Sequence, residues 1–147
     1  MPGRKAYIAI DIPTHPLAWL TRKHKAEFEI VSSKKGEDGT KWWAATGTAD
    51  PADYPRVAEA LKSSTASGLV EVISLSGPLV VETRIEAFDT LDRESRFEFI
   101  PLRISGGRFL CIVSSANPQT LNFAVRQLQK PGVTVEILNE ERRVLCG

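Results

Sequence analysis

The sequence predicts an α+β fold built from two tandem βαββαβ repeats whose sheets are mostly antiparallel. The tripeptide Ala49-Asp50-Pro51 recurs 67 residues later as Ala116-Asn117-Pro118, and Asp or Asn before Pro is typical of a helix start. After both tripeptides, apolar residues follow the i, i+3, i+4, i+7 spacing of one helix face. Similar apolar segments flank the two helices in the same order, at 28–31 and 97–100 before them and at 70–73 and 135–138 after them. This repeated order predicts an internal duplication.

The first predicted repeat spans residues 1–77 and begins with a strand over 6–12, where isoleucines alternate with other residues. The turn Pro13-Thr14-His15-Pro16 ends this strand and opens a helix over 16–25, with Thr14 or His15 at its start. Alternating residues, a glycine-containing turn and helical spacing predict the remaining elements. These are a strand at 28–32, a hairpin loop at 34–39, a strand at 42–48, a helix at 53–64 and a strand at 69–75.

The second helix is expected to start at Asp53, because Pro55 deep inside a longer helix would remove a backbone hydrogen bond. The short joint Ser76-Gly77-Pro78 leads into the second predicted repeat, residues 78–147, which we expect to lie close against the first. Its predicted elements are strands at 79–85, 96–104, 109–115 and 133–138, a short helix at 87–94 and a helix at 118–130. The βαββαβ order is the ferredoxin-like arrangement, a four-stranded antiparallel sheet with two helices on one face.

Composition is that of an ordinary globular protein, with 42% hydrophobic and 25% charged residues. The formal net charge of +1 creates no bulk field that would attract nucleic acid or an anionic membrane. Cys111 and Cys146 form no C-x-x-C motif, which favours a reducing, cytoplasmic setting. Met1 leads into the first strand without a signal peptide, and no apolar run could cross a bilayer, so we expect no membrane partner.

The sequence contains no catalytic motif, and we predict no catalytic residue, metal site or cofactor. His15 and His24 are the only histidines, and they are too far apart for a helical i, i+4 metal pair. We predict a non-enzymatic regulatory module that senses a small molecule. The alternative is a small enzyme with a pocket between sheet and helices, which a buried pocket holding a group of strongly shifted pKa would favour. A flat apolar face without a pocket would indicate an assembly protein instead.

A second alternative is an RNA-recognition module, because that class of domain shares this fold and stacks bases on strand aromatics. The segment Gly107–Val113 is similar to the central strand of such modules, with Phe109 as its one aromatic residue. Cys111 and Val113 stand where further aromatics are expected. Carboxylates on the same sheet face would repel phosphates, so we expect no direct nucleic-acid binding. The polar members of this alternation include Asp11, Glu27, Glu29, Glu82, Arg84, Glu98 and Glu136.

Trp42 and Trp43 are the leading candidates for a ligand site, because neighbours on a strand point to opposite faces. One indole should enter the core, and the other should meet the open sheet face or the other repeat. We place a small-molecule ligand in the cleft between the repeats, where Tyr7 and Arg84 can reach it from the first strand of each. Arg84 could bind an anionic group through its guanidinium fork. The alternative is that both tryptophans only pack, and that Arg84 pairs with a carboxylate on the sheet surface.

Tandem βαββαβ units with this pattern resemble the ACT-type family of small-molecule-sensing modules. More specifically, the chain is similar to the N-terminal sensory region of archaeal regulators like the bacterio-opsin activator, through Pro16-Leu17-Ala18-Trp19-Leu20, Phe99-Ile100-Pro101-Leu102 and Gly107. The resemblance implies a tandem ferredoxin-like fold, a sensory role and a link to transcription regulation. Two features depart from the family. No helix-turn-helix follows Leu138, and the turn Pro13-Thr14-His15-Pro16 lacks the glycine that usually admits an amino acid.

Ferredoxin-like units expose sheet edges and an open sheet face, and proteins usually cover both. The second repeat has more apolar strand residues than the inner face of one sheet should hold, among them Val80, Ile100, Leu102 and Ile104. We therefore predict a homo-oligomer in which some of these residues lie at a symmetric subunit contact.

Overall fold

The structure is a computed structural model that describes residues 3–89, 97–115 and 117–143. The 3-10 turn η2 (Glu86–Phe88) covers the start of the short helix predicted at 87–94, whose remainder from residue 90 lies outside the described residues. A second 3-10 turn, η1 (Thr65–Ser67), follows the second helix. The helices are α1 (Pro16–Lys23), α2 (Tyr54–Ser64) and α3 (Pro118–Leu128). The strands are β1 (Gly3–Asp11), β2 (Ala26–Lys35), β3 (Lys41–Ala49), β4 (Val70–Ser74), β5 (Leu79–Thr83), β6 (Glu98–Ser105), β7 (Arg108–Ser115) and β8 (Thr134–Arg143).

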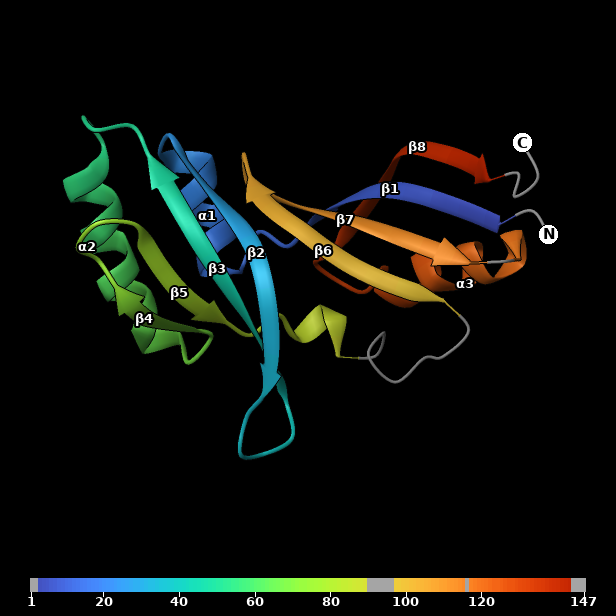
Figure 1. Cartoon of the computed structure of the whole chain (residues 1–147), viewed down its shortest axis with the longest axis horizontal. Helices are drawn as coiled ribbons and strands as arrows, with labels where there is room; N and C mark the ends of the chain where they lie inside the picture. Colours follow the sequence, from blue (N-terminus) through green and yellow to red (C-terminus); the bar gives the residue numbers. More distant parts are fainter. Residues whose placement is uncertain (1–2, 90–96, 116, 144–147) are drawn as a thin grey trace.

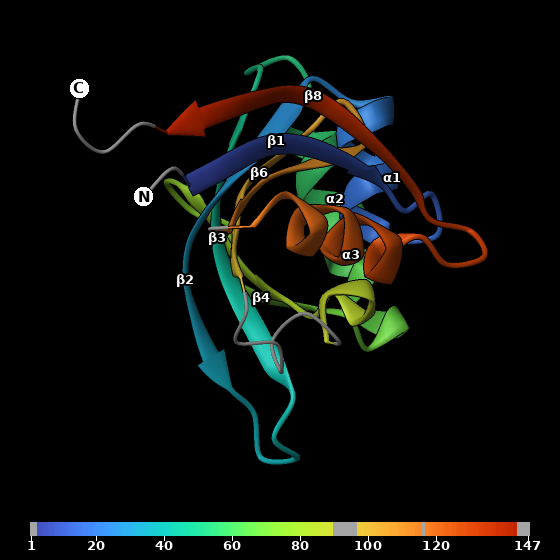
Figure 2. The ribbon, with the colours of Figure 1, turned by 90° about the vertical axis from the view of Figure 1, so that its right-hand side faces the viewer.

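The eight strands of the described chain form one sheet in the order β4-β5-β3-β2-β6-β7-β1-β8, and every neighbouring pair is antiparallel. Figures 1 and 2 show a long, twisted sheet that curves around three α-helices gathered on one side. The α+β class and the antiparallel pairing predicted from the sequence are confirmed. A separate sheet for each repeat is not seen, because strands from the whole chain join a single sheet.

Two strands pair with partners that their place in the sequence does not suggest. Strand β1 lies between β7 and β8, which belong to the other end of the chain. Strand β5 lies between β3 and β4, which precede it. The two parts of the sheet meet where β2 pairs with β6 over only three residue pairs, Glu27–Glu29 against Arg103–Ser105. The segments that follow β1 and β5 also cross from one part of the sheet to the other.

The core lies between the sheet and the helices, and Phe88 of η2 is at its centre. Its ring meets the rings of Trp43, Phe99 and Phe109 edge-on, with ring centres 6.4, 4.7 and 5.9 Å away. These three partners lie on β3, β6 and β7, so one side chain contacts strands from both parts of the sheet. Because Phe88 and Phe109 are fully buried, the hydrophobic core is continuous across the short β2–β6 ladder.

The strand order makes a specific prediction about fragments of the chain. Because β1 has its partners in the later part of the described chain, we expect fragment 1–77 to lack a dispersed amide spectrum by NMR when it is expressed alone. Mixing it with fragment 78–147 should restore the spectrum of the intact chain. Two fragments that each fold alone, with β1 paired inside the first, would contradict the observed order.

Candidate functional site

His15 caps the first helix and binds the segment that follows β5. Its Nδ1 accepts a hydrogen bond from the backbone N–H of Leu17 at 3.1 Å. The hydrogen of the neutral ring is therefore on Nε2, which donates to the carbonyl oxygen of Arg84 at 3.0 Å. The hydroxyl of Thr83 lies 3.1 Å from Nε2 and donates its own hydrogen to the carbonyl oxygen of Leu69 at 2.8 Å. One imidazole thus joins the β1–α1 turn to the end of β5 and, through Thr83, to the start of β4.

The environment of His15 keeps its ring neutral. Only 3% of the residue is exposed, and its ring lies edge-on to Phe109 with 5.1 Å between ring centres. Burial lowers the pKa of His15 to about 4, although the hydrogen bond to the Arg84 carbonyl acts in the opposite direction. The expectation that Thr14 or His15 opens this helix is confirmed, with His15 as the capping residue.

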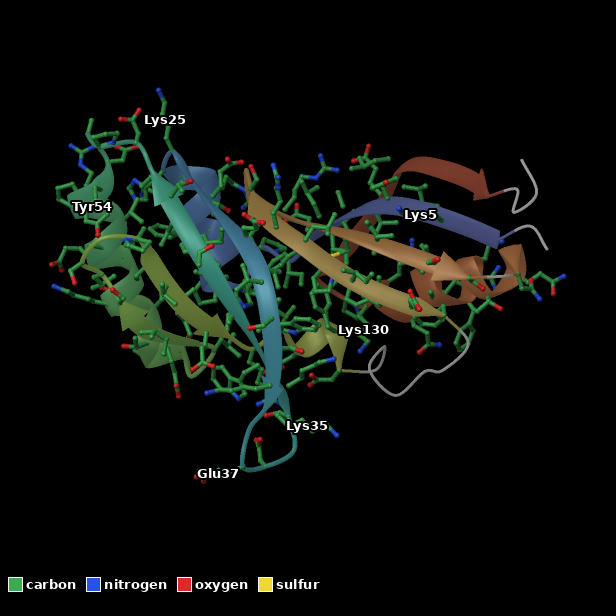
Figure 3. The ribbon with its side chains drawn as sticks, in the orientation of Figure 1. Lys5, Lys25, Lys35, Glu37, Tyr54 and Lys130 are labelled. Carbon is green, nitrogen blue, oxygen red and sulfur yellow. The ribbon has the colours of Figure 1, made fainter. Side chains whose placement is uncertain are left out.

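A pocket of about 330 Å³ adjoins His15 at this junction, and we call it the junction pocket. Four segments that are distant in sequence build it: the β1–α1 turn, the residue before β4, the segment through η2, and the loop between α3 and β8. Figure 3 labels Lys130, which comes from that last loop and shares the pocket lining with Glu86 of η2. The residues that line it include Ile12, Thr14, Ile85, Glu86, Lys130 and Val133.

The structure separates the four residues predicted to bind a ligand. Trp43 is in the core with 7% of its surface exposed, whereas Trp42 lies on the opposite face and is partly buried, as strand alternation predicted for this pair. Tyr7 lies on β1 opposite Ile112, in the other part of the sheet. Trp42, Trp43 and Arg84 lie at the same end of the adjoining strands β3 and β5, because Trp43 pairs with Thr83, but the two indoles are on opposite faces of the sheet. None of the four lines the junction pocket.

Arg84 contributes to the junction through its backbone, since its carbonyl oxygen receives the His15 hydrogen bond. Its guanidinium forms an ion pair with Asp89 at 3.6 Å, rather than with a carboxylate of the sheet surface. Its Nε is buried without a hydrogen-bond partner among the described residues. The sheet carboxylate of Glu82 pairs instead with Lys34 at 2.9 Å.

The junction pocket does hold an ionisable group of strongly shifted pKa, which was the observation expected to favour an enzyme. Both nitrogens of His15 are already engaged by buried groups of the protein, so the ring has neither a proton nor a lone pair to offer a substrate. Burial raises the pKa of the Cys111 thiol well above its usual range, so this cysteine is no ready nucleophile. Within the described ranges, no group of three or more His, Cys, Asp or Glu residues could hold a metal ion. The shifted pKa of His15 therefore reflects a structural role.

Sequence reasoning missed the junction pocket because its walls meet only through the crossing of β1 and β5. The available signal was local: the short turn between two prolines placed His15 beside a strand end and a helix start. Comparison of the chain with protein-family models, with curated proteins and with solved structures finds no match. No helix in the described part of the chain is long and apolar enough to span a membrane.

The lowered pKa of His15 predicts how stability depends on pH. In the unfolded chain His15 binds a proton below its ordinary pKa of 6.5, whereas the folded chain resists protonation until about pH 4. The free energy of unfolding should therefore fall as pH drops from about 6.5 to about 4, by on the order of 3 kcal/mol, and level off below that. Urea unfolding across this range measures the effect.

A His15→Asn variant keeps a capping side chain but loses the ring, and it should lose most of this pH dependence together with some stability at pH 7. His24→Gln, which changes the other histidine, should retain the dependence. A stability profile that is the same in the wild type and in His15→Asn would show that His15 is not the responsible group.

Proposed function

We propose that this protein is a non-enzymatic regulatory module that senses a small molecule at the junction pocket. The observation that carries the proposal is the origin of the pocket walls, because segments on both sides of the joint Ser76-Gly77-Pro78 form them. A ligand bound there contacts the β1–α1 turn and the segment after β5 together. Binding is thereby coupled to the way in which the two parts of the sheet are held against each other.

The pocket has the character of a site for a metabolite-sized ligand. Ile12, Ile85 and Val133 provide apolar walls, and Thr14 and Glu86 add a hydroxyl and a carboxylate to the lining. Its volume of about 330 Å³ is at the lower end of the range of small-molecule sites. An apolar ligand body with a few polar groups suits such a lining. The pocket is thus in a different place from the site formed by Trp42, Trp43, Tyr7 and Arg84 that the sequence predicted.

The sheet order supports a second part of the proposal, that the chain is a duplicated ferredoxin-like unit whose first strands have exchanged places. Counted inward from each edge of the sheet, the strand orders are β4-β5-β3-β2 and β8-β1-β7-β6. When each strand is numbered by its position within a βαββαβ unit, both orders read last, first, third and second. Helices α2 and α3 both lead from a third strand to a last strand. An unexchanged pair of repeats would place β1 beside β3 and β5 beside β7. A sensory role linked to transcription remains the proposal that the ACT-type resemblance suggests.

The structure gives less support to the alternatives. The enzyme alternative rested on a group of strongly shifted pKa in a pocket, and that group, His15, has both ring nitrogens engaged by the protein. The RNA-recognition alternative needs Phe109 on the open sheet face, but Phe109 is fully buried in the core. The free thiol of Cys111 is consistent with the reducing, cytoplasmic setting that the sequence predicts.

Thermal-shift screening against a metabolite library tests the sensing proposal. A ligand that binds only the folded chain at a hundredfold excess over its dissociation constant should raise Tm by about 5–10 °C. Thr14→Trp, at an exposed residue of the pocket lining, should abolish the shift, because the indole would occupy ligand space. Thr48→Trp is the matched control at an exposed threonine on β3 and should leave the shift intact. A hit that stabilises both variants equally, or a complete library without any hit, would count against this site.

A further inference from the structure

The outer face of the sheet, opposite the helices, has a continuous apolar area over β6, β7, β1 and β8. We call it the apolar band: Tyr7, Ile100, Leu102, Leu110, Ile112 and Leu138. Ile100, Ile112 and Tyr7 lie opposite one another across three neighbouring strands. Ile100 is 45% exposed, Leu102 37% and Leu138 47%, and part of the band borders a hollow of about 360 Å³. Some of Val80, Ile100, Leu102 and Ile104 were expected at a subunit contact; Ile100 and Leu102 belong to the band, and Ile104 is fully buried in the core.

The fold itself does not require this band. Strand β3 occupies the place in its part of the sheet that β7 occupies in the other. Its outward residues are Trp42, Ala44, Thr46 and Thr48, which alternate with the buried Trp43, Ala45 and Gly47. Only Trp42, near the start of the strand, is large, so small and polar side chains are sufficient along the rest of this position. The large aliphatic side chains on β7 indicate that something covers the band.

Two rows of residues beside the apolar band have a cation at one end and an anion at the other. Opposed residues of a ladder point to the same face, so the row through Leu110 runs from Arg103 on β6 to Glu136 on β8. The adjacent row has the same polarity, with Arg108 on β7 opposite Asp11 on β1, although the Asp11 carboxylate also pairs with Arg22 of α1 at 3.0 Å. In both of these rows the cation lies on the β6–β7 side and the anion on the β1–β8 side, whereas the row beyond Ile112, from Glu98 on β6 to Lys5 on β1, has the reverse polarity. Such a pattern is complementary to a copy of itself turned by 180° about an axis along the strands.

We propose that a second copy of this chain covers the apolar band, with a two-fold axis parallel to the strands between β7 and β1. This rotation brings Arg103 of one chain against Glu136 of the second copy, and Arg108 against Asp11. It also brings Ile112 of each chain against Tyr7 of the other. These three pairs are complementary in charge or in apolar character, as a symmetric interface requires.

The charge pattern favours a second copy over other occupants. Glu29 and Glu98 flank the band on exposed positions and would repel both anionic lipid and nucleic-acid phosphates. The sheet is convex on this side (Figure 2), so contact is limited to the strands nearest the axis and the dimer should be weak. Arg108 also pairs with Glu136 within the chain at 2.5 Å, with 39% and 64% of their side chains exposed. These exposed charges act chiefly on orientation and specificity, and the apolar band supplies the buried surface.

Two single charge reversals and their mixture test the proposal. Analytical ultracentrifugation of the intact chain, from about one to several hundred micromolar, should show a monomer–dimer equilibrium. Arg103→Glu and Glu136→Arg each place like charges against each other twice, and each should raise the dissociation constant at least about tenfold. An equimolar mixture should form a heterodimer in which both contacts are again opposite in sign, with a dissociation constant within about threefold of the wild type.

Lys62→Glu is the control, because it disrupts the exposed Lys62–Glu59 ion pair of α2, far from the band, and should not affect dimerisation. Leu102→Gln weakens the dimer without a charge change and covers the case in which Glu136→Arg fails to fold. A wild-type monomer throughout the series overturns the proposal, as does a dimer that neither reversal weakens. Folded single variants that do not form a heterodimer on mixing also overturn the proposal. So does a monomer that co-sediments with anionic phospholipid vesicles. The band and the junction pocket share no lining residue, so either can fail without the other.

Discussion

The hydrogen bonds of His15 fasten together the two chain segments that cross the middle of the molecule. One segment follows β1 and the other follows β5, and each carries the chain from one part of the sheet to the other. The sheet alone joins these parts over three residue pairs of β2 and β6. Much of the connection between the two parts of the sheet therefore depends on the buried imidazole, the hydroxyl of Thr83 and the ring of Phe88. Because a buried polar group left without its partner costs about 1–3 kcal/mol, this junction tolerates little change.

The sequence predicted local features well and strand neighbours poorly, for a physical reason. Alternation of side chains reveals which face of a strand is buried, so Trp43 was correctly separated from Trp42. The same alternation does not identify the neighbouring strand, because any strand with the right pattern can form the ladder. The pairing of β1 with β7 and β8, and of β5 with β3 and β4, therefore stayed hidden. Without it, Tyr7 and Arg84 were expected in one cleft, although they lie in different parts of the sheet.

The junction pocket and the apolar band both follow from this strand order. Crossing segments leave a pocket where four distant parts of the chain meet, and that pocket is the place where a ligand would affect the connection between the parts. The open sheet face is long, and the part over β6, β7, β1 and β8 has a continuous group of large apolar residues. A ligand that tightens the junction would thus act on the same strands that meet a second copy. Under both proposals, ligand binding and association would be linked.

The pairing of β1 is the central claim, and NMR measures it directly. Antiparallel partners bring Hα atoms of opposed residues close together, which gives strong cross-strand nuclear Overhauser effects. We expect such contacts between β1 and β7 near Ile8 and Cys111, and between β3 and β5 near Ala45 and Val81. Contacts from β1 to β3 and from β5 to β7 would contradict it, because they would show two repeats that each keep their own first strand.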